Sequence, residues 1–110
     1  MTDALADRCS LLGAAVVPLM TAAITSQGGD PKALADVIEQ LAKVRAVVAR
    51  GTGEISQADY VSWASTAPGL LDAMEEAAKA GDPATVWRLF TDREIGFHKL
   101  GTACAGQPGW

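Results

Sequence analysis

The stretch CSLLGAAVVPLMTAAITSQGG, residues 9–29, decides the fold, because no charged side chain lies between Arg8 and Asp30. Apolar residues recur along it at alternating steps of four and three, as in the seam of a packed helix. The seam consists of Leu5, Cys9, Leu12, Val16, Leu19 and Ala23. Other apolar residues fill much of the remaining circumference, so such a helix must be buried on more than one side. We expect a central bundle helix or one that also forms a subunit interface.

A membrane span and a signal peptide are the alternatives for so apolar a stretch. About 20 apolar residues can cross a bilayer. This stretch, however, contains several hydroxyl groups, a proline and many alanines, which insert weakly. A signal peptide begins with a positively charged region, whereas this chain begins with Asp3, Asp7 and Arg8. We therefore expect no membrane span and a cytoplasmic protein.

Length and composition set further limits. A chain of 110 residues fits one domain, and its richness in alanine favours helix. The net charge of -4, without clustered lysine and arginine, argues against a nucleic-acid-binding surface. In a cytoplasmic protein, Cys9 and Cys104 are expected to be thiols rather than a structural disulfide. Whether the two cysteines pair is left open by the sequence.

Start and stop signals divide the chain into four helices. The first is expected to begin near Thr2 or Asp3, to kink at Pro18 and to end before Gly28. In the second, Asp30 is the N-cap, Pro31 the first residue and Gly51 the stop. The third covers residues 56–80 and is expected to break at Pro68-Gly69. The fourth covers residues 83–101, with Gly81-Asp82-Pro83 repeating the start signal of the second.

These segments predict an all-α fold, a four-helix up-down-up-down bundle formed by residues 1–101. Residues 102–110 contain Gly106, Pro108 and Gly109, which predict a non-helical tail. Trp110 is expected to be either a loose end or an anchor that folds back on the bundle. In this topology the start of the first helix and the end of the fourth lie at the same end of the bundle.

Cys9, His98 and Cys104 would therefore be neighbours, and they are the candidates for a metal site or a redox pair. The alternative is that Cys9 is a small apolar core residue and that His98 is a surface residue at a helix end. No close Cys-x-x-Cys or His-x-x-x-His pair occurs in the chain, so the spacing of a zinc site is absent. We expect no metal and no cofactor.

The segment Phe97-His98-Lys99-Leu100-Gly101-Thr102-Ala103 resembles the phosphorylated-histidine segment of histidine phosphotransfer domains, which are also four-helix bundles. The resemblance covers about seven residues and implies phosphotransfer through His98. The chain departs from the family pattern at Gly101, where the family has a lysine. The family's helix also continues beyond its histidine, whereas here glycine and proline follow.

A second resemblance covers more of the chain. Residues 75–82, with a last helix that ends at Leu100-Gly101-Thr102-Ala103-Cys104, are similar to the end of cytochrome c′-type bundles. That family attaches haem through Cys-x-x-Cys-His at this place. Here only Cys104 is present and no histidine follows it, which excludes covalent haem. The resemblance implies a shared fold and no function by itself.

The aromatic residues have two interpretations. Trp63, Phe90 and Phe97 either fill the core of an alanine-rich bundle or line a ligand pocket at its centre, between Pro18 and Pro68. Trp87 is expected to point outward as an interface residue. No catalytic motif is recognisable in the sequence, so we expect no enzymatic activity.

The sequence thus predicts a non-enzymatic bundle that acts through protein–protein contacts. Because the first helix is too apolar for one buried face, we expect a homodimer, or another protein partner, with this helix in the interface. The expected outward residues are Leu11, Ala15, Met20 and Ala22. A small-molecule or cofactor-binding bundle and histidine phosphotransfer are the alternative functions.

Overall fold

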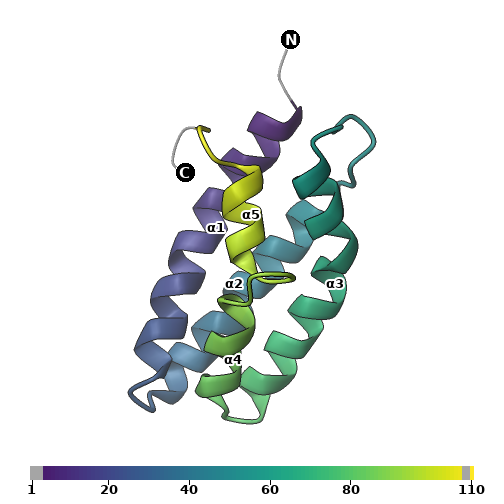
Figure 1. Cartoon of the computed structure of the whole chain (residues 1–110). Helices are drawn as coiled ribbons and strands as arrows, with labels where there is room; N and C mark the ends of the chain where they lie inside the picture. The colour runs from purple at the N-terminus through teal and green to yellow at the C-terminus, as the bar shows by residue number, and fades with distance from the viewer. Residues whose placement is uncertain (1–3, 108–109) are drawn as a thin grey trace.

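The computed structural model describes residues 4–107 and 110, and every regular element within them is a helix (Figure 1). The all-α class is therefore confirmed. Five helices are present in this part of the chain, one more than we expected. They are α1 (Ala4–Ser26), α2 (Pro31–Val48), α3 (Ala58–Lys79), α4 (Pro83–Phe90) and α5 (Phe97–Ala103).

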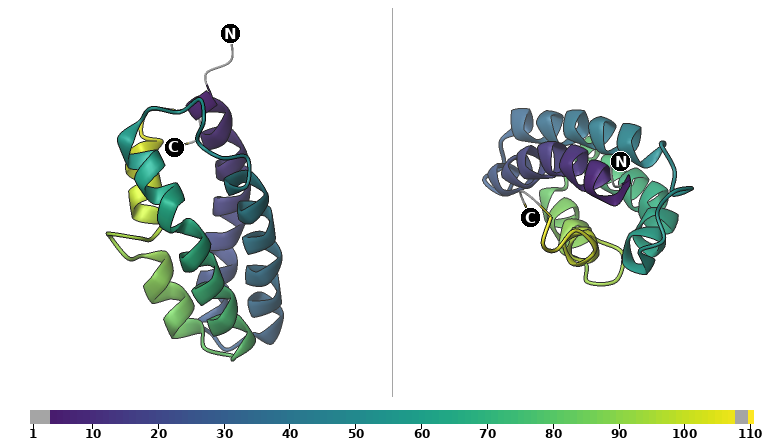
Figure 2. Two further views of the ribbon diagram at one scale, coloured as in Figure 1. Left: turned by 90° about the vertical axis from the view of Figure 1, so that its right-hand side faces the viewer. Right: turned by 90° about the horizontal axis from the view of Figure 1, so that it is seen from above.

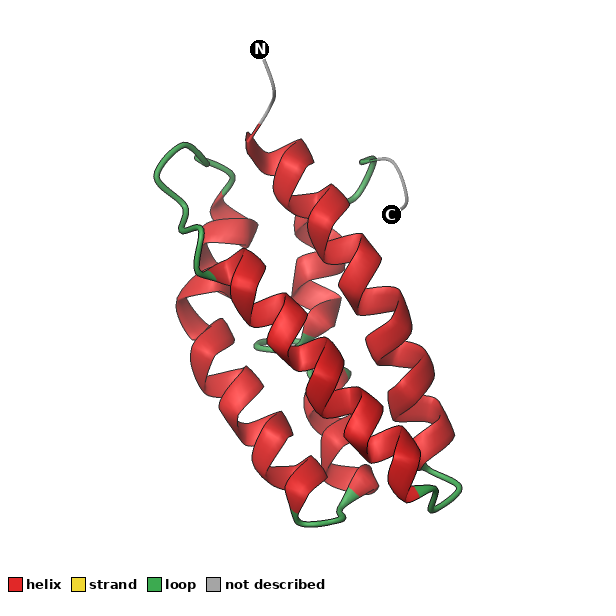
Figure 3. Cartoon of the chain, turned by 180° about the vertical axis from the view of Figure 1, so that it is seen from behind, coloured by secondary structure: helices red, strands yellow, loops and turns green. Residues whose placement is uncertain are grey.

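The helices form an elongated body with principal extents of 44 × 22 × 21 Å. α1 and α2 lie side by side, and α2 packs in turn on α3 (Figure 2). α4 and α5 follow one another along α3, and α4 also contacts α1. The view from behind shows how short turns connect the long helices (Figure 3). α1 is thus flanked by α2 on one side and by α4 on the other.

α1 packs against α2 and α4 and buries a broad face. Its seam is confirmed, because Cys9, Leu12 and Leu19 are fully buried and Leu5 is half-buried. The helix continues through Pro18, whose side chain is exposed. The kink that we expected at Pro18 stays a prediction.

The length and composition of α1 would also allow it to cross a membrane. Of its most apolar window, 44% is buried inside the protein. The core helix of a helical bundle meets the same criteria of length and hydropathy.

The boundaries of α2 follow the predicted signals. Asp30 is the N-cap, and its side chain accepts a hydrogen bond from the Lys32 backbone N–H at 2.9 Å. Pro31 is the first helical residue, where its missing N–H has no cost. The helix ends at Val48, and Gly51 follows with φ of +79°, a left-handed conformation that suits glycine.

α3 corrects the expected break at Pro68-Gly69, because the helix is continuous from Ala58 to Lys79. Pro68 and Gly69 both lie on its exposed side. Ala67 and Leu70, directly before and after them, are buried in the core. Packing on both sides of the proline outweighs the one backbone hydrogen bond that proline removes.

The prediction of one unbroken fourth helix is wrong, because residues 91–96 divide it into α4 and α5. The Asp92 side chain accepts hydrogen bonds from the backbone N–H groups of Glu94 at 2.8 Å and Ile95 at 3.1 Å. This local turn competes with helix for the same donors. The single fourth helix of a four-helix bundle is therefore replaced by two short helices.

The C-terminal tail also differs from the prediction, because α5 extends to Ala103 and so includes the first two residues of the expected tail. Trp110 is an anchor: its indole N–H donates to the carbonyl oxygen of Cys9 at 2.7 Å and lies over Gly13. Residues 108–109 lie outside the described residues. So do residues 1–3, which include the expected helix start at Thr2 or Asp3.

Two aspartates should make the α4 region sensitive to acid. Hydrogen bonds from the Thr85 hydroxyl and backbone N–H lower the pKa of Asp82 below its ordinary 3.8, and those from Ile95 and Glu94 lower the pKa of Asp92. A lowered folded-state pKa means that each carboxylate stabilises the fold above pH 3.8 and that this contribution disappears as pH falls through the lowered value.

We expect Asp82→Ala to lower the melting temperature by a few degrees at pH 7, because it removes the N-cap of α4. Thermal melts followed by circular dichroism at several pH values test this expectation. The difference between the variant and the wild type should shrink as pH falls below 3.8 and disappear once pH falls through the lowered pKa of Asp82, where the folded cap becomes protonated. A difference that stays constant down to pH 2 would contradict the role of the carboxylate.

Candidate functional site

From Cys9 to its end at Ser26, α1 has no charged side chain on its outer face. Its exposed residues between Arg8 and Asp30 are apolar, hydroxyl-bearing or amide-bearing. Three large apolar side chains stand out on it, with exposed fractions of 54% for Val17, 39% for Met20 and 53% for Ile24. Their spacing of three and four places them on one strip of the helix. We call Val17, Met20 and Ile24 the α1 ridge.

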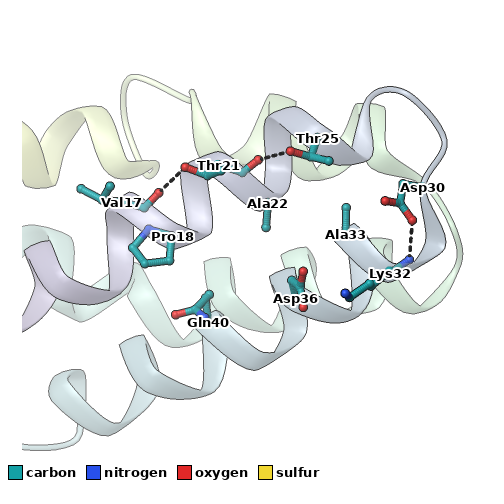
Figure 4. A pocket seen from close by; sticks show the side chains of 10 residues that line it. All are labelled: Val17, Pro18, Thr21, Ala22, Thr25, Asp30, Lys32, Ala33, Asp36 and Gln40. Atoms are coloured by element: carbon teal, nitrogen blue, oxygen red, sulfur yellow. Dashed lines mark hydrogen bonds between the residues drawn. The ribbon is translucent and has the colours of Figure 1, made fainter.

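Two threonines beside the ridge add little polarity to it. The Thr21 hydroxyl donates to the carbonyl oxygen of Val17 at 3.1 Å, and the Thr25 hydroxyl donates to the carbonyl oxygen of Thr21 at 2.9 Å (Figure 4). Both hydroxyl protons are therefore bonded within the helix itself. The face offers apolar contact more than it offers hydrogen-bond donors.

A hollow of about 630 Å³ lies between α1 and α2, directly beside the ridge. Ala22 of α1 and Ala33 of α2 point toward one another across it, and their small side chains leave it unfilled (Figure 4). We call this hollow the α1–α2 furrow. Its lining is Val17, Pro18, Thr21, Ala22, Thr25, Asp30, Lys32, Ala33, Asp36 and Gln40.

The two walls of the furrow differ in chemistry. The α1 wall is uncharged, whereas Lys32, Asp36 and Gln40 form the α2 wall. The charged residues of the lining are one lysine, Lys32, and two aspartates, Asp30 and Asp36, so the furrow is net negative. The Gln40 side-chain oxygen is buried and has no hydrogen-bond partner.

A charged cluster marks the N-terminal end of the uncharged face. The Arg8 guanidinium lies 3.0 Å from the Asp7 carboxylate, and Arg50 of the α2–α3 connection lies 3.7 Å from the same group. Tyr60 at the start of α3 is buried, and this burial raises the pKa of its hydroxyl. The Asp7–Arg50 pair joins the start of α1 to the α2–α3 connection.

A second groove, of about 310 Å³, lies on the other side of the ridge. Phe90 and Phe97, two of the three residues predicted for a ligand pocket, line it, and their rings stack with centroids 4.8 Å apart. Trp63 is fully buried and contacts Phe97 with ring centroids 5.8 Å apart. The remaining lining residues are Val16, Met20, Thr91, His98 and Trp110.

This groove differs from the central pocket that we expected. Trp63 belongs to the core, Pro18 lines the α1–α2 furrow, and Pro68 lines a separate hollow between α2 and α3. His98 is exposed at the groove. A ligand-binding function and phosphotransfer through His98 both stay predictions.

Cys9 and Cys104 form a disulfide, which corrects the expectation of two thiols. Both residues are fully buried and the bond links α1 to the residue that follows α5. The expected proximity of the chain ends is therefore confirmed for the cysteines. Neither is a free thiol available to a metal, and the described residues contain no cluster of three or more His, Cys, Asp or Glu that would hold one.

The predicted interface residues are only partly outward. Met20 is exposed and Leu11 is half-buried, but Ala15 and Ala22 are 3% and 7% exposed and belong to the core of the chain. They are buried because α2 covers that side of α1. Trp87 is half-buried, and its ring stacks on Phe90 with centroids 5.6 Å apart.

Val17 and Ile24 are the exposed residues that the prediction missed. Their signal was present in the sequence, since Val17, Met20 and Ile24 share a helical strip within an uncharged stretch. The sequence does not say which side of this apolar helix the neighbouring helices cover.

No protein-family model, no curated protein and no solved structure matches this chain. The case for a function therefore depends on the chain's own geometry. The exposed feature of α1 is an uncharged ridge beside a furrow with small side chains at its base. It is a surface that can bury apolar area against another helix.

Proposed function

We propose that this protein acts without catalysis, by protein–protein contact, and that the outer face of α1 is its contact surface. The exposed α1 ridge carries the proposal. Removing apolar surface from water contributes about 25 cal/mol per Å². Val17 and Ile24, each more than half exposed, would gain most of that contribution only when a partner covers them.

The arrangement of these side chains is more informative than their number. Single exposed apolar residues are normal on protein surfaces, whereas contiguous patches mark interaction sites. Val17, Met20 and Ile24 lie on one strip, and no charged residue interrupts the sequence between Arg8 and Asp30. Interface centres are similarly depleted of charge.

Self-association is the form of contact that we propose, and the charge distribution indicates where on the surface it would occur. The chain has a net charge of -4, so two copies repel one another over most of their surfaces. Residues 9–29 of α1 and the turn after it carry no charge and so add nothing to that repulsion. We therefore expect a homodimer with α1 in the interface.

The disulfide bears on where this contact is made. Structural disulfides persist in oxidising compartments and are rare in the cytosol. The Cys9–Cys104 bond therefore favours an oxidising compartment over the expected cytoplasm as the place of assembly.

Val17→Glu should dissociate the dimer, raising its dissociation constant at least tenfold, because a carboxylate would be buried without a partner. Sedimentation velocity at tens of micromolar measures the change. Val61→Glu is the matched control, since Val61 is 38% exposed but lies on α3. A wild-type protein that is monomeric at this concentration, or a Val61→Glu variant that dissociates equally, would refute the proposed contact.

A further inference from the structure

We infer that Trp110 controls access to the Cys9–Cys104 disulfide, because it ties the residues that follow α5 to α1 and so limits the rate at which a dithiol reduces the bond. The inference goes beyond the proposed contact surface and does not depend on it. The residues that carry it are Cys9, Gly13, Cys104 and Trp110, which lie outside the α1 ridge. The burial of the disulfide is the starting point.

The disulfide is inaccessible in the closed structure. Neither Cys9 nor Cys104 has any exposed surface. Thiol–disulfide exchange begins when a thiolate attacks one of the two sulfur atoms, so its rate depends on access to them. Part of the protein must therefore open before a reductant can react.

The Cys104 side of the bond is where opening is easiest. Cys9 lies in α1, a helix of 23 residues that packs on α2 and α4. Cys104 directly follows α5, which has seven residues and whose N-cap, Gly96, provides no side-chain hydrogen bond. Short helices depend on tertiary contacts, and local opening begins where such contacts are few. We therefore expect the sulfur of Cys104 to become accessible when the end of α5 unfolds locally.

Trp110 opposes this opening. The Cys104 carbonyl oxygen accepts a hydrogen bond from the Gln107 N–H at 2.9 Å, and the Gln107 carbonyl oxygen accepts one from the Trp110 N–H at 3.0 Å. The Trp110 indole N–H then donates to the carbonyl oxygen of Cys9 at 2.7 Å. This series of bonds returns the chain to the residue that the disulfide joins to Cys104. It must be released before the end of α5 can unfold.

The position of the indole ring agrees with this role. The ring lines the groove to which α1 contributes Val16 and α5 contributes Phe97. It therefore lies beside both of the segments that the disulfide links. A Cβ atom at Gly13, one turn after Cys9, would lie 3.4 Å from Nε1 and 3.8 Å from Cε2 of Trp110. A methyl group there would touch the ring, and a branched side chain would compete with the ring for space.

Reduction by dithiothreitol is the reaction that tests the inference. One thiolate of the reductant attacks a protein sulfur, the S–S bond breaks and a mixed disulfide forms. The second thiolate of the reductant then attacks the mixed disulfide, which closes the cyclic disulfide of oxidised dithiothreitol. Two electrons pass to the protein, and Cys9 and Cys104 end as thiols whose protons replace those that the reductant lost.

Trp110→Ala should be reduced about tenfold faster than the wild type, because it removes one hydrogen bond and the ring from the segment that must open. Gly13→Val should accelerate reduction in the same direction without changing Trp110. Trp87→Ala is the matched control: it removes another half-buried tryptophan, one that stacks on Phe90 of α4. Its reduction rate should stay within about twofold of the wild type. Acid quenching followed by thiol titration gives the rates.

A urea series below the unfolding transition separates local opening from global unfolding. Local opening exposes little surface, so the reduction rate should rise only weakly with urea. Circular dichroism checks that each variant is folded at the start, and all rates are measured at one protein concentration.

Equal reduction rates for the wild type and Trp110→Ala would overturn the inference. So would an equal acceleration in Trp87→Ala, or a urea dependence as steep as that of global unfolding, because overall stability and not Trp110 would then govern access. A monomeric wild type would refute the proposed dimer and leave these rates unaffected, so the two failures are distinguishable.

Discussion

Replacing Cys9 and Cys104 together with alanine should lower the free energy of unfolding by about 4 kcal/mol, or roughly 20 °C in melting temperature. The disulfide closes a loop with a sequence separation of 95 residues. Cross-links that close long loops restrict the unfolded chain most. Both side chains are fully buried, so their truncation also removes packing.

The loss should be greatest around α5. This helix has seven residues, too few to be stable without tertiary contacts. The disulfide joins the residue after α5 to α1, and the Trp110 indole binds the carbonyl oxygen of Cys9 in the same place. Hydrogen exchange should therefore accelerate in α5 before it accelerates in α2 or α3.

Reductant provides the control for this prediction. Dithiothreitol should lower the melting temperature of the wild type toward that of the double variant and leave the double variant unchanged. Thiol titration verifies the reduction, and all melts use one protein concentration because association also affects stability. Equal melting temperatures for fully reduced and oxidised wild type would contradict the role of the disulfide.

Gly96→Ala should destabilise the protein by about 3 kcal/mol. A Cβ atom at Gly96 would lie 2.5 Å from the carbonyl oxygen of Asp92 and 2.7 Å from those of Leu89 and Phe90. All three are backbone atoms, so the turn between α4 and α5 must move to make room. Phe90 and Phe97, which stack across this turn, would lose part of their contact.

Gly101→Ala is the matched control, because it adds the same methyl group inside α5. No atom lies within 4 Å of a Cβ built there. Alanine is also a better helix former than glycine, so this variant should gain about 0.5–1 kcal/mol. Urea unfolding gives both values. If the two substitutions changed the free energy of unfolding in the same direction, the close approach at Gly96 would not constrain the turn.

The helix pattern was readable from the sequence because its signals are local. The seam of α1 follows from the spacing of apolar residues, and the start of α2 follows from Asp30 and Pro31. The break expected at Pro68-Gly69 and the unbroken last helix were both wrong. At Pro68-Gly69, core packing outweighs the local preference for a break. In the last helix, the turn formed by Asp92 interrupts the helix.

The candidate site was predictable in part. The uncharged stretch pointed to α1 as the helix with excess apolar surface, and Met20 is among its exposed residues. Ala15 and Ala22 were assigned to the wrong side, and Val17 and Ile24 were missed. A helix that is apolar nearly all round does not show in its own sequence which sides the neighbouring helices will cover.

The sequence by itself therefore determined the all-α class, the limits of the long helices and the excess apolar surface of α1. These properties follow from residue spacing, capping and charge along the chain. Only the tertiary structure decided the Cys9–Cys104 bond, the anchoring of Trp110 and the position of the ridge beside the furrow. Each of these depends on how segments far apart in the chain pack together, and local sequence patterns do not determine that packing.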